Sequence, residues 1–251
     1  MMKLTRPAMP ASPCAKPIAA ARWARRLHPR IIPATLALSA LALSTSAWAS
    51  AGSKPAEAAT KTANSALLND LPFTDKTSFE LAHKGFIAPL PSAVIQGAQG
   101  NMIWDPNKYD FIKEGAGAPD TVNPSLWRQA QLLNISGLFQ VTDGIYQVRN
   151  LDLSNMTIVE GKEGLTIMDP LISTETAKAA LDLYYQHRPK KPVVAVIYTH
   201  SHVDHYGGVR GVVDEADVKA GKVKIYAPLG FLEHAVAENV MAGTAMSRRA
   251  S

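Results

Sequence analysis

Short apolar runs alternate with turn signals from Gly137 onward. Four runs have the β-branched and aromatic composition that is typical of strands. Asp143-Gly144 separates the first two runs and is a typical hairpin turn, and a glycine-flanked turn at 161–164 separates the last two. The pattern predicts a β-meander with strands at 138–141, 145–148, 156–160 and 165–169.

The apolar period then becomes helical. Between Ser173 and His187, four apolar residues share one face and predict an amphipathic helix: Ala177, Ala180, Leu181 and Tyr184. A continuous apolar run at 193–198 predicts a buried strand. Residues 223–228 predict another strand, and residues 231–240 another helix. Strands and helices that alternate in this way indicate an α/β layered fold.

The pattern before this region is less regular. Residues 50–66 are rich in Ala, Ser, Lys and Thr, which predicts a mobile segment or a loosely packed helix. Residues 78–86 predict a short helix. A further helix is expected after Asn123, which would cap it, with proline at its first position. These residues carry no obvious metal chemistry, so we expect 50–136 to be an N-terminal extension that wraps a core domain at 137–251.

The first 49 residues differ from the rest in charge. They hold seven of the 26 basic residues and no acid, which leaves 19 basic against 21 acidic residues. The net charge of +5 therefore belongs to this leader, and we reject nucleic-acid binding as its explanation. The basic start, an apolar stretch at about 31–43 and small residues at Ala47 and Ala49 predict a signal peptide cleaved after Ala49. Arg25-Arg26 resembles a twin-arginine signal, but the residues that follow favour general secretion.

We therefore expect a periplasmic or secreted protein. The apolar stretch of the leader is too short for a transmembrane anchor, so no integral anchor is expected after cleavage. A hydrophobic fraction of 47% and a charged fraction of 19% are typical of a globular protein. Cys14 is the one cysteine and lies in the leader. The mature chain would have no disulfide, and its metal ligands would be His, Asp or Glu.

The densest chemistry follows the apolar run at 193–198. Residues 199–208 hold three of the seven histidines and an aspartate within six positions: His200, His202, Asp204 and His205. Imidazole nitrogens suit zinc, and a carboxylate can complete or share its coordination shell. A solvated loop without metal is the simpler alternative, but neighbouring histidines would repel when protonated and need partners when neutral. The spacing favours a metal site.

Three other groups carry side chains that can bind a metal. Asp169 ends a predicted strand and is expected either to lie near the site or to cap a turn. His234 and Glu238 lie one turn apart on a predicted helix, where an ion pair is favoured over a metal site. His83 is expected to be a surface or capping residue rather than a ligand.

The stretch His200-Ser201-His202-Val203-Asp204-His205 resembles the H-x-H-x-D-H signature of the metallo-β-lactamase superfamily. The meander, helix and apolar strand before it resemble the superfamily's setting for that signature. The resemblance implies an αββα sandwich with a one- or two-metal site at the edge of its sheets. Several flanking segments are similar to the zinc-dependent alkylsulfatases: 118–129, 144–149, 152–155, 169–177, 207–211, 238–243 and 245–250.

This resemblance implies an enzyme that hydrolyses alkyl sulfate esters such as dodecyl sulfate. His200 and His202 would bind a first Zn²⁺ ion, and Asp204 and His205 a second. Hydroxide held between the two ions would be the nucleophile, because cations lower its pKa. Asp204 would also orient that hydroxide. Enzymes of this group are typically secreted or periplasmic homodimers.

The chain also departs from the family pattern. Further carboxylate and histidine ligands are expected well downstream of the motif, but only 46 residues of this sequence follow His205, and His234 is the only histidine among them. We therefore expect the N-terminal half of the sandwich with its N-terminal extension, from a truncated product that is inactive by itself. Two alternatives stay open. One is another hydrolase of the superfamily, and the other is a non-catalytic protein that keeps the loop without a full site.

Overall fold

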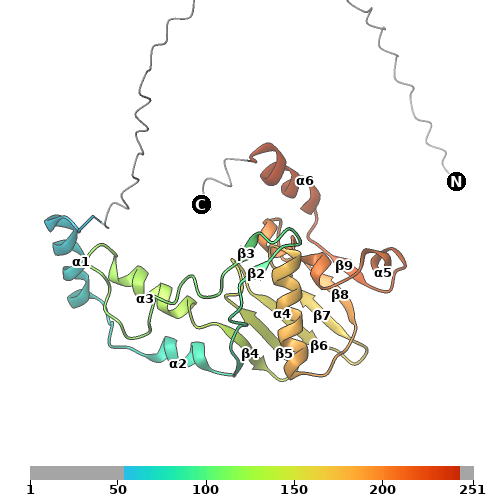
Figure 1. Ribbon diagram of the computed structural model, residues 1–251, viewed down its shortest axis with the longest axis horizontal. Coiled ribbons are helices and arrows are strands. Elements are labelled where there is room, and N and C mark those ends of the chain that lie inside the picture. Colours follow the sequence, from blue (N-terminus) through green and yellow to red (C-terminus); the bar gives the residue numbers. More distant parts are fainter. Residues whose placement is uncertain (1–53, 244–251) are drawn as a thin grey trace, which may run out of the picture. The chain divides into compact units, whose positions relative to one another are not determined.

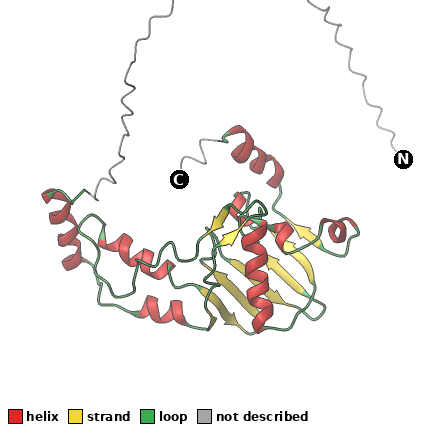
Figure 2. Ribbon diagram, viewed as in Figure 1, coloured by secondary structure: helices red, strands yellow, loops and turns green. Residues whose placement is uncertain are grey.

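The computed structural model describes residues 54–243. The predicted leader and its cleavage site lie outside these residues. The helices are α1 (Ala58–Asp70), α2 (Thr77–His83), α3 (Pro124–Leu133), α4 (Thr174–His187), α5 (Glu215–Lys219) and α6 (Phe231–Val236). The strands are β1 (Phe86–Ala88), β2 (Ile95–Gln96), β3 (Met102–Trp104), β4 (Gly137–Thr142), β5 (Ile145–Arg149), β6 (Met156–Glu160), β7 (Leu165–Met168), β8 (Val193–Ile197) and β9 (Lys224–Tyr226). Figure 1 shows these elements in sequence colours, and Figure 2 colours them by type.

The central element is a mixed seven-stranded sheet in the order β1-β4-β5-β6-β7-β8-β9. Strands β4 to β7 form the predicted antiparallel meander, and the turn at Asp143-Gly144 joins the first two. Gly144 has a φ of +74°, a left-handed conformation that glycine adopts without strain. β8 and β9 continue the sheet in parallel with β7. The α/β prediction is confirmed.

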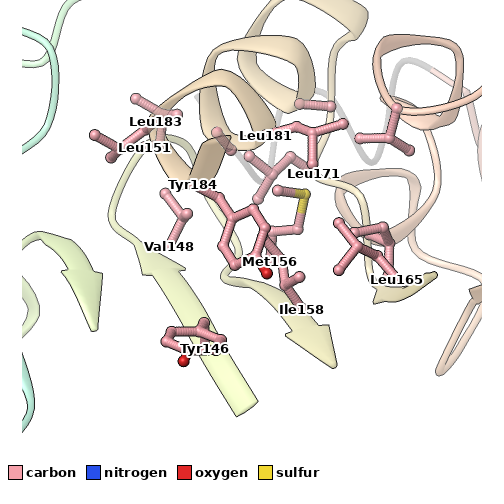
Figure 3. Packing of buried hydrophobic residues seen from close by; sticks show 14 of the residues in the cluster. Tyr146, Val148, Leu151, Met156, Ile158, Leu165, Leu171, Leu181, Leu183 and Tyr184 are labelled. Carbon is pink, nitrogen blue, oxygen red and sulfur yellow. The ribbon is translucent and has the colours of Figure 1, made fainter. Parts of the chain in front are cut away.

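Helix α4 covers one face of the sheet (Figure 1). It begins at a capping box, in which the Ser173 side chain accepts from the Thr176 amide and Thr176 reaches back to the Ser173 backbone. The four residues expected to share its apolar face are all buried. Tyr184 lies over the sheet residues Tyr146, Met156 and Ile158 (Figure 3), and its ring contacts that of Tyr146 edge to face at 5.6 Å. Alternate residues of β5, β6 and β7 therefore form one core with this helix.

The segment before the meander contains the expected short helices. Residues 58–70 are helical with no buried residue, which matches the loosely packed alternative. α3 begins as predicted, because the Asn123 side chain accepts from the Ser125 amide and Pro124 occupies the first turn. β1 extends the sheet by pairing with β4, although it belongs to the predicted extension. The extension and the core region therefore share one sheet.

The strand at 193–198 is less buried than its sequence indicates. Within β8 only Val196 is buried, and its other four residues are partly exposed. β8 lies next to the edge strand β9, whose three residues are all exposed. β8 is therefore less well covered than a strand in the centre of the sheet. Among residues 54–243, no helix combines the length and apolar character needed to cross a bilayer.

Candidate metal centre

The histidine-rich stretch forms a loop at one edge of the sheet. β7 and β8 run parallel, so Asp169, directly after β7, and Thr199, two residues after β8, leave the sheet at the same edge. In layered α/β proteins, ligands bind at the carboxyl ends of parallel strands. The loop then turns through two short 3₁₀ helices, Val203–His205 and Val209–Gly211. This local winding turns the closely spaced histidines toward one another.

The three histidine rings of the loop lie close together. The His200 ring centroid is 4.7 Å from that of His202 and 4.0 Å from that of His205. The His202 side chain is 51% exposed, whereas those of Asp204 and His205 are 23% and 21% exposed. The site therefore opens to solvent at His202 and is more enclosed at His205. All four predicted ligands lie in this one loop.

Three carboxylates approach these rings. Asp169 Oδ2 lies 3.0 Å from His205 Nδ1, and Asp204 Oδ2 lies 3.2 Å from His205 Nε2. Glu238 Oε1 lies 3.2 Å from His202 Nε2. Carboxylates beside imidazoles are a common arrangement around protein-bound metals, as ligands or as groups that orient the histidines.

Asp169 lies at the site, as one of its two interpretations predicted. Its carboxylate accepts from the Thr199 amide at 2.9 Å and from the Thr199 hydroxyl at 2.7 Å. The same hydroxyl lies 3.0 Å from His200 Nδ1. Asp169 also has a φ of +54°, a left-handed conformation that costs about 1–3 kcal/mol outside glycine and is often found at functional sites. Asp169 thus joins the end of β7 to the start of the histidine-rich loop at 199–208, here called the metal loop.

The prediction of an ion pair between His234 and Glu238 is wrong. No such pair occurs within 4.0 Å in the part of the chain that the structure describes, and Glu238 faces His202 instead. The reason is that α6 ends at Val236 and the chain continues as a π-helical turn, Ala237–Met241, which changes the residue spacing. His83 lies on the surface and contacts Glu114 at 2.8 Å, as expected for a residue outside the site.

The donor atoms suit a zinc ion, although they do not enclose one. His205 Nδ1 is buried and close to Asp169, but the two groups do not align as a hydrogen bond, so this nitrogen has no such partner among the described residues. A buried nitrogen without a hydrogen-bond partner needs an explanation, and metal ligation supplies one. Within residues 54–243, no three His, Cys, Asp or Glu side chains form a ready metal cage. The loop gathers the ligands without closing a shell.

Two glycines let the loop pack against the start of α4. A Cβ on Gly207 would come within 3.0 Å of the Ile172 and Val203 carbonyl oxygens, and one on Gly208 would meet Pro170 and Ser173 in the same way. The Gly208 amide also donates to the Leu171 carbonyl at 2.9 Å. These glycines therefore allow close approach of the two backbones directly after the candidate ligands.

Sequence reasoning missed a buried pair beside the loop. Asp152 and Ser154 are 4% and 7% exposed, and the Ser154 hydroxyl donates to the Asp204 carbonyl at 2.5 Å. Burial raises the pKa of the Asp152 carboxyl, and hydrogen bonds from Ile172, Ser154 and Thr176 oppose that rise. The Asp-x-Ser pattern, which favours a turn closed by the aspartate side chain, was the available signal.

The fold and this loop are similar to those of the metallo-β-lactamase superfamily. Residues 149–245 match the Metallo-beta-lactamase superfamily. The chain is 81% identical to a linear primary-alkylsulfatase of Pseudomonas sp. over 216 residues, which cover 86% of this chain and 32% of that protein. It is 57% identical to an (R)-specific secondary-alkylsulfatase of Pseudomonas sp., over 91% of this chain and 34% of the relative.

A solved structure is also similar. The stereoselective inverting sec-alkylsulfatase Pisa1 from Pseudomonas sp. superposes with a TM-score of 0.73 at 61% identity, over 78% of this chain and 31% of that one. The similarity to this structure supports the α/β fold that the superfamily signature implied. The chain spans about a third of the length of the curated relatives that it matches.

Proposed function

We propose that this chain forms part of an enzyme that hydrolyses alkyl sulfate esters, such as dodecyl sulfate, to alcohol and sulfate. The observation that carries the proposal is the H-x-H-x-D-H loop at the carboxyl edge of β7 and β8, in a chain 81% identical to a linear primary-alkylsulfatase. The two alkylsulfatase relatives favour a sulfate ester over the substrates of other hydrolases in the superfamily.

In this proposal His200 and His202 would hold one Zn²⁺ ion, and Asp204 and His205 would hold a second. Bound zinc would supply a water of lowered pKa and stabilise the negative charge of the sulfate group. Asp204 orients the attacking oxygen, and Asp169 holds His205 and Thr199 in place through its short contacts. Exposed His202 lies at the side from which an ester reaches the site. The enzyme is proposed to be a homodimer exported by the leader peptide.

Metal binding by the chain is tested first. Zinc bound after dialysis, and its dissociation constant against a competing chelator, are measured for the chain and for His202→Ala and Asp204→Ala. Each substitution removes a proposed ligand, so we expect zinc affinity to fall at least 10–100-fold, the range found when even supporting groups are lost. His83→Ala is the matched control, because His83 is an exposed histidine outside the loop, and its side chain pairs with the surface carboxylate of Glu114.

Activity is tested in a protein of the relatives' full length that contains this chain. Sulfate release from dodecyl sulfate is followed with zinc supplied, and we expect it to disappear in His202→Ala and Asp204→Ala but not in His83→Ala. Zinc binding that is unchanged in both ligand variants would refute the metal assignment. A zinc-loaded protein that does not hydrolyse alkyl sulfates but cleaves a lactam, lactone or thioester would refute the substrate assignment and leave the metal assignment standing.

A further inference from the structure

Asp152 is a buried carboxylate in the loop between β5 and β6. It is 4% exposed, and in the described part of the chain no side-chain nitrogen of lysine, arginine or histidine lies within 4.0 Å of its carboxylate oxygens. Burying a carboxylate without a cation is costly unless hydrogen bonds satisfy its oxygens. When all of its hydrogen bonds are satisfied, such a buried polar group makes the structure around it more rigid.

The hydrogen bonds of Asp152 join two segments that are distant in sequence. Its Oδ1 accepts from the Ser154 amide at 3.1 Å. Its Oδ2 accepts from the Ile172 amide at 3.0 Å and from the Thr176 hydroxyl at 2.7 Å. Ile172 and Thr176 belong to the capped start of α4, which is packed against the core. Asp152 therefore ties the 150–155 loop to a rigid helix end.

Ser154 links Asp152 to the metal loop through two hydrogen bonds. The amide that donates to Asp152 and the hydroxyl that donates to the Asp204 carbonyl belong to the same residue, so the turn at Asp152 aims the hydroxyl. On its other side the metal loop is held by the Gly208 amide, which donates to the Leu171 carbonyl. Both attachments lead back to residues 171–176. The backbone at Asp204 is therefore set from outside the loop.

We propose that Asp152 and Ser154 are positioning residues of the metal centre, which fix the Asp204 backbone so that Asp204 and His205 present their donor atoms together. The proposal rests on the proposed metal-binding function, but it concerns residues that hold no metal themselves. Groups behind the ligands typically change metal affinity 10–100-fold when they are lost. We therefore expect Ser154→Ala to weaken zinc binding about tenfold or more.

The test compares Ser154→Ala and Asp152→Asn with Tyr185→Phe in the 251-residue chain. The Tyr185 hydroxyl also donates to a backbone carbonyl, that of Lys191 at 2.6 Å, but at the opposite end of α4. Tyr185→Phe thus removes the same kind of hydrogen bond away from the loop. Zinc affinity is measured by chelator competition, and thermal unfolding without metal is recorded for each variant.

Two further measurements separate positioning from general stability. The visible spectrum of bound Co²⁺ reports ligand geometry, and we expect it to change in Ser154→Ala and Asp152→Asn but not in Tyr185→Phe. Amide hydrogen exchange in the metal-free chain should quicken at His205 and Gly207 in the first two variants only. Asp152→Asn keeps the shape of the side chain, so this variant provides the test if Ser154→Ala does not fold.

The outcomes separate this proposal from the proposed function. If the parent chain binds zinc and both variants match its affinity and Co²⁺ spectrum, the positioning role is overturned and the metal site stands, even where thermal stability falls. If the parent chain binds neither ion, the metal site and the positioning role are both overturned. Weaker zinc binding with an altered Co²⁺ spectrum in both variants, and an unchanged control, supports the proposal.

Discussion

Substituting Gly208 by alanine tests whether close packing, rather than backbone freedom, places glycine after the metal loop. Gly208 has a φ of −84°, which any residue adopts without strain. An added Cβ would nevertheless lie within 3.0 Å of the Pro170 and Ser173 carbonyl oxygens and of the Ala177 Cβ. Two of these atoms belong to the backbone before α4, so they cannot rotate away. The loop or the helix start must shift to admit one methyl group.

The expected cost follows from that crowding. Overpacking in a well-packed region destabilises by about 1–3 kcal/mol, and we place Gly208→Ala at the upper end because backbone atoms are involved. For a domain of this size each kcal/mol lowers the melting temperature by about 2–4 °C, which gives roughly 6–12 °C. Thermal and urea unfolding of the metal-free chain, followed by circular dichroism, measure the change.

Gly117→Ala is the matched control. Gly117 is exposed, has no positive φ, and its added Cβ would meet no atom within 4 Å. This substitution should be neutral or stabilise by about 0.4–1 kcal/mol, because alanine reduces the freedom of the unfolded chain. A Gly208→Ala protein whose unfolding midpoint equals that of Gly117→Ala would refute the packing argument. We also expect Gly208→Ala to weaken zinc binding, because the loop and α4 would move apart.

Substitutions at three further residues test the scaffold under the site. Glu160 accepts from Arg188 and Tyr184, and the hydrogen bond from Arg188 holds its pKa below the ordinary 4.5. Its contribution is therefore full above pH 4.5 and is lost as the pH falls below it, so Glu160→Gln should cost about 1.5–3 kcal/mol at neutral pH and less in acid. Urea midpoints across pH check this, and a pH-independent difference would contradict it. Ser173→Ala removes the α4 cap and should cost about 1 kcal/mol in the same assay, whereas Ser173→Asp should retain most stability. Ile167→Ala should cost about 2–5 kcal/mol, because Ile167 is fully buried and leaves a cavity.

Local patterns predicted most elements near the site. Alternation and turn residues located the meander, and the helix at 173–187 was delimited by its cap and its apolar face. These signals succeed because they depend on neighbouring residues alone. Partial burial of β8 was not predictable in this way, since it depends on the short neighbour β9. The pairing of β1 with β4 was missed for a similar reason, because it joins residues about fifty positions apart.

In the site, too, features set by neighbouring residues were predictable and features set by distant residues were not. Spacing predicted His200, His202, Asp204 and His205 as ligands, and the end of a predicted strand made Asp169 a candidate for the site. The position of Glu238 was wrongly predicted, because a π-helical turn replaced the assumed helical period. The roles of Asp152 and Ser154 were not predicted, since nothing in their own segment shows that the carbonyl of Asp204 lies against the Ser154 hydroxyl.

The sequence alone predicted the α/β fold and placed four possible metal donors in one loop, because both depend on short runs of residues: an alternating strand pattern, a capped helix and four donors within six positions. The tertiary structure alone decided which groups surround those donors. Parallel strands bring Asp169 to His205, a π-helical turn brings Glu238 to His202, and a buried carboxylate ties Ser154 to Asp204. Those contacts join residues far apart in the chain, so they arise only once the sheet and α4 have packed together.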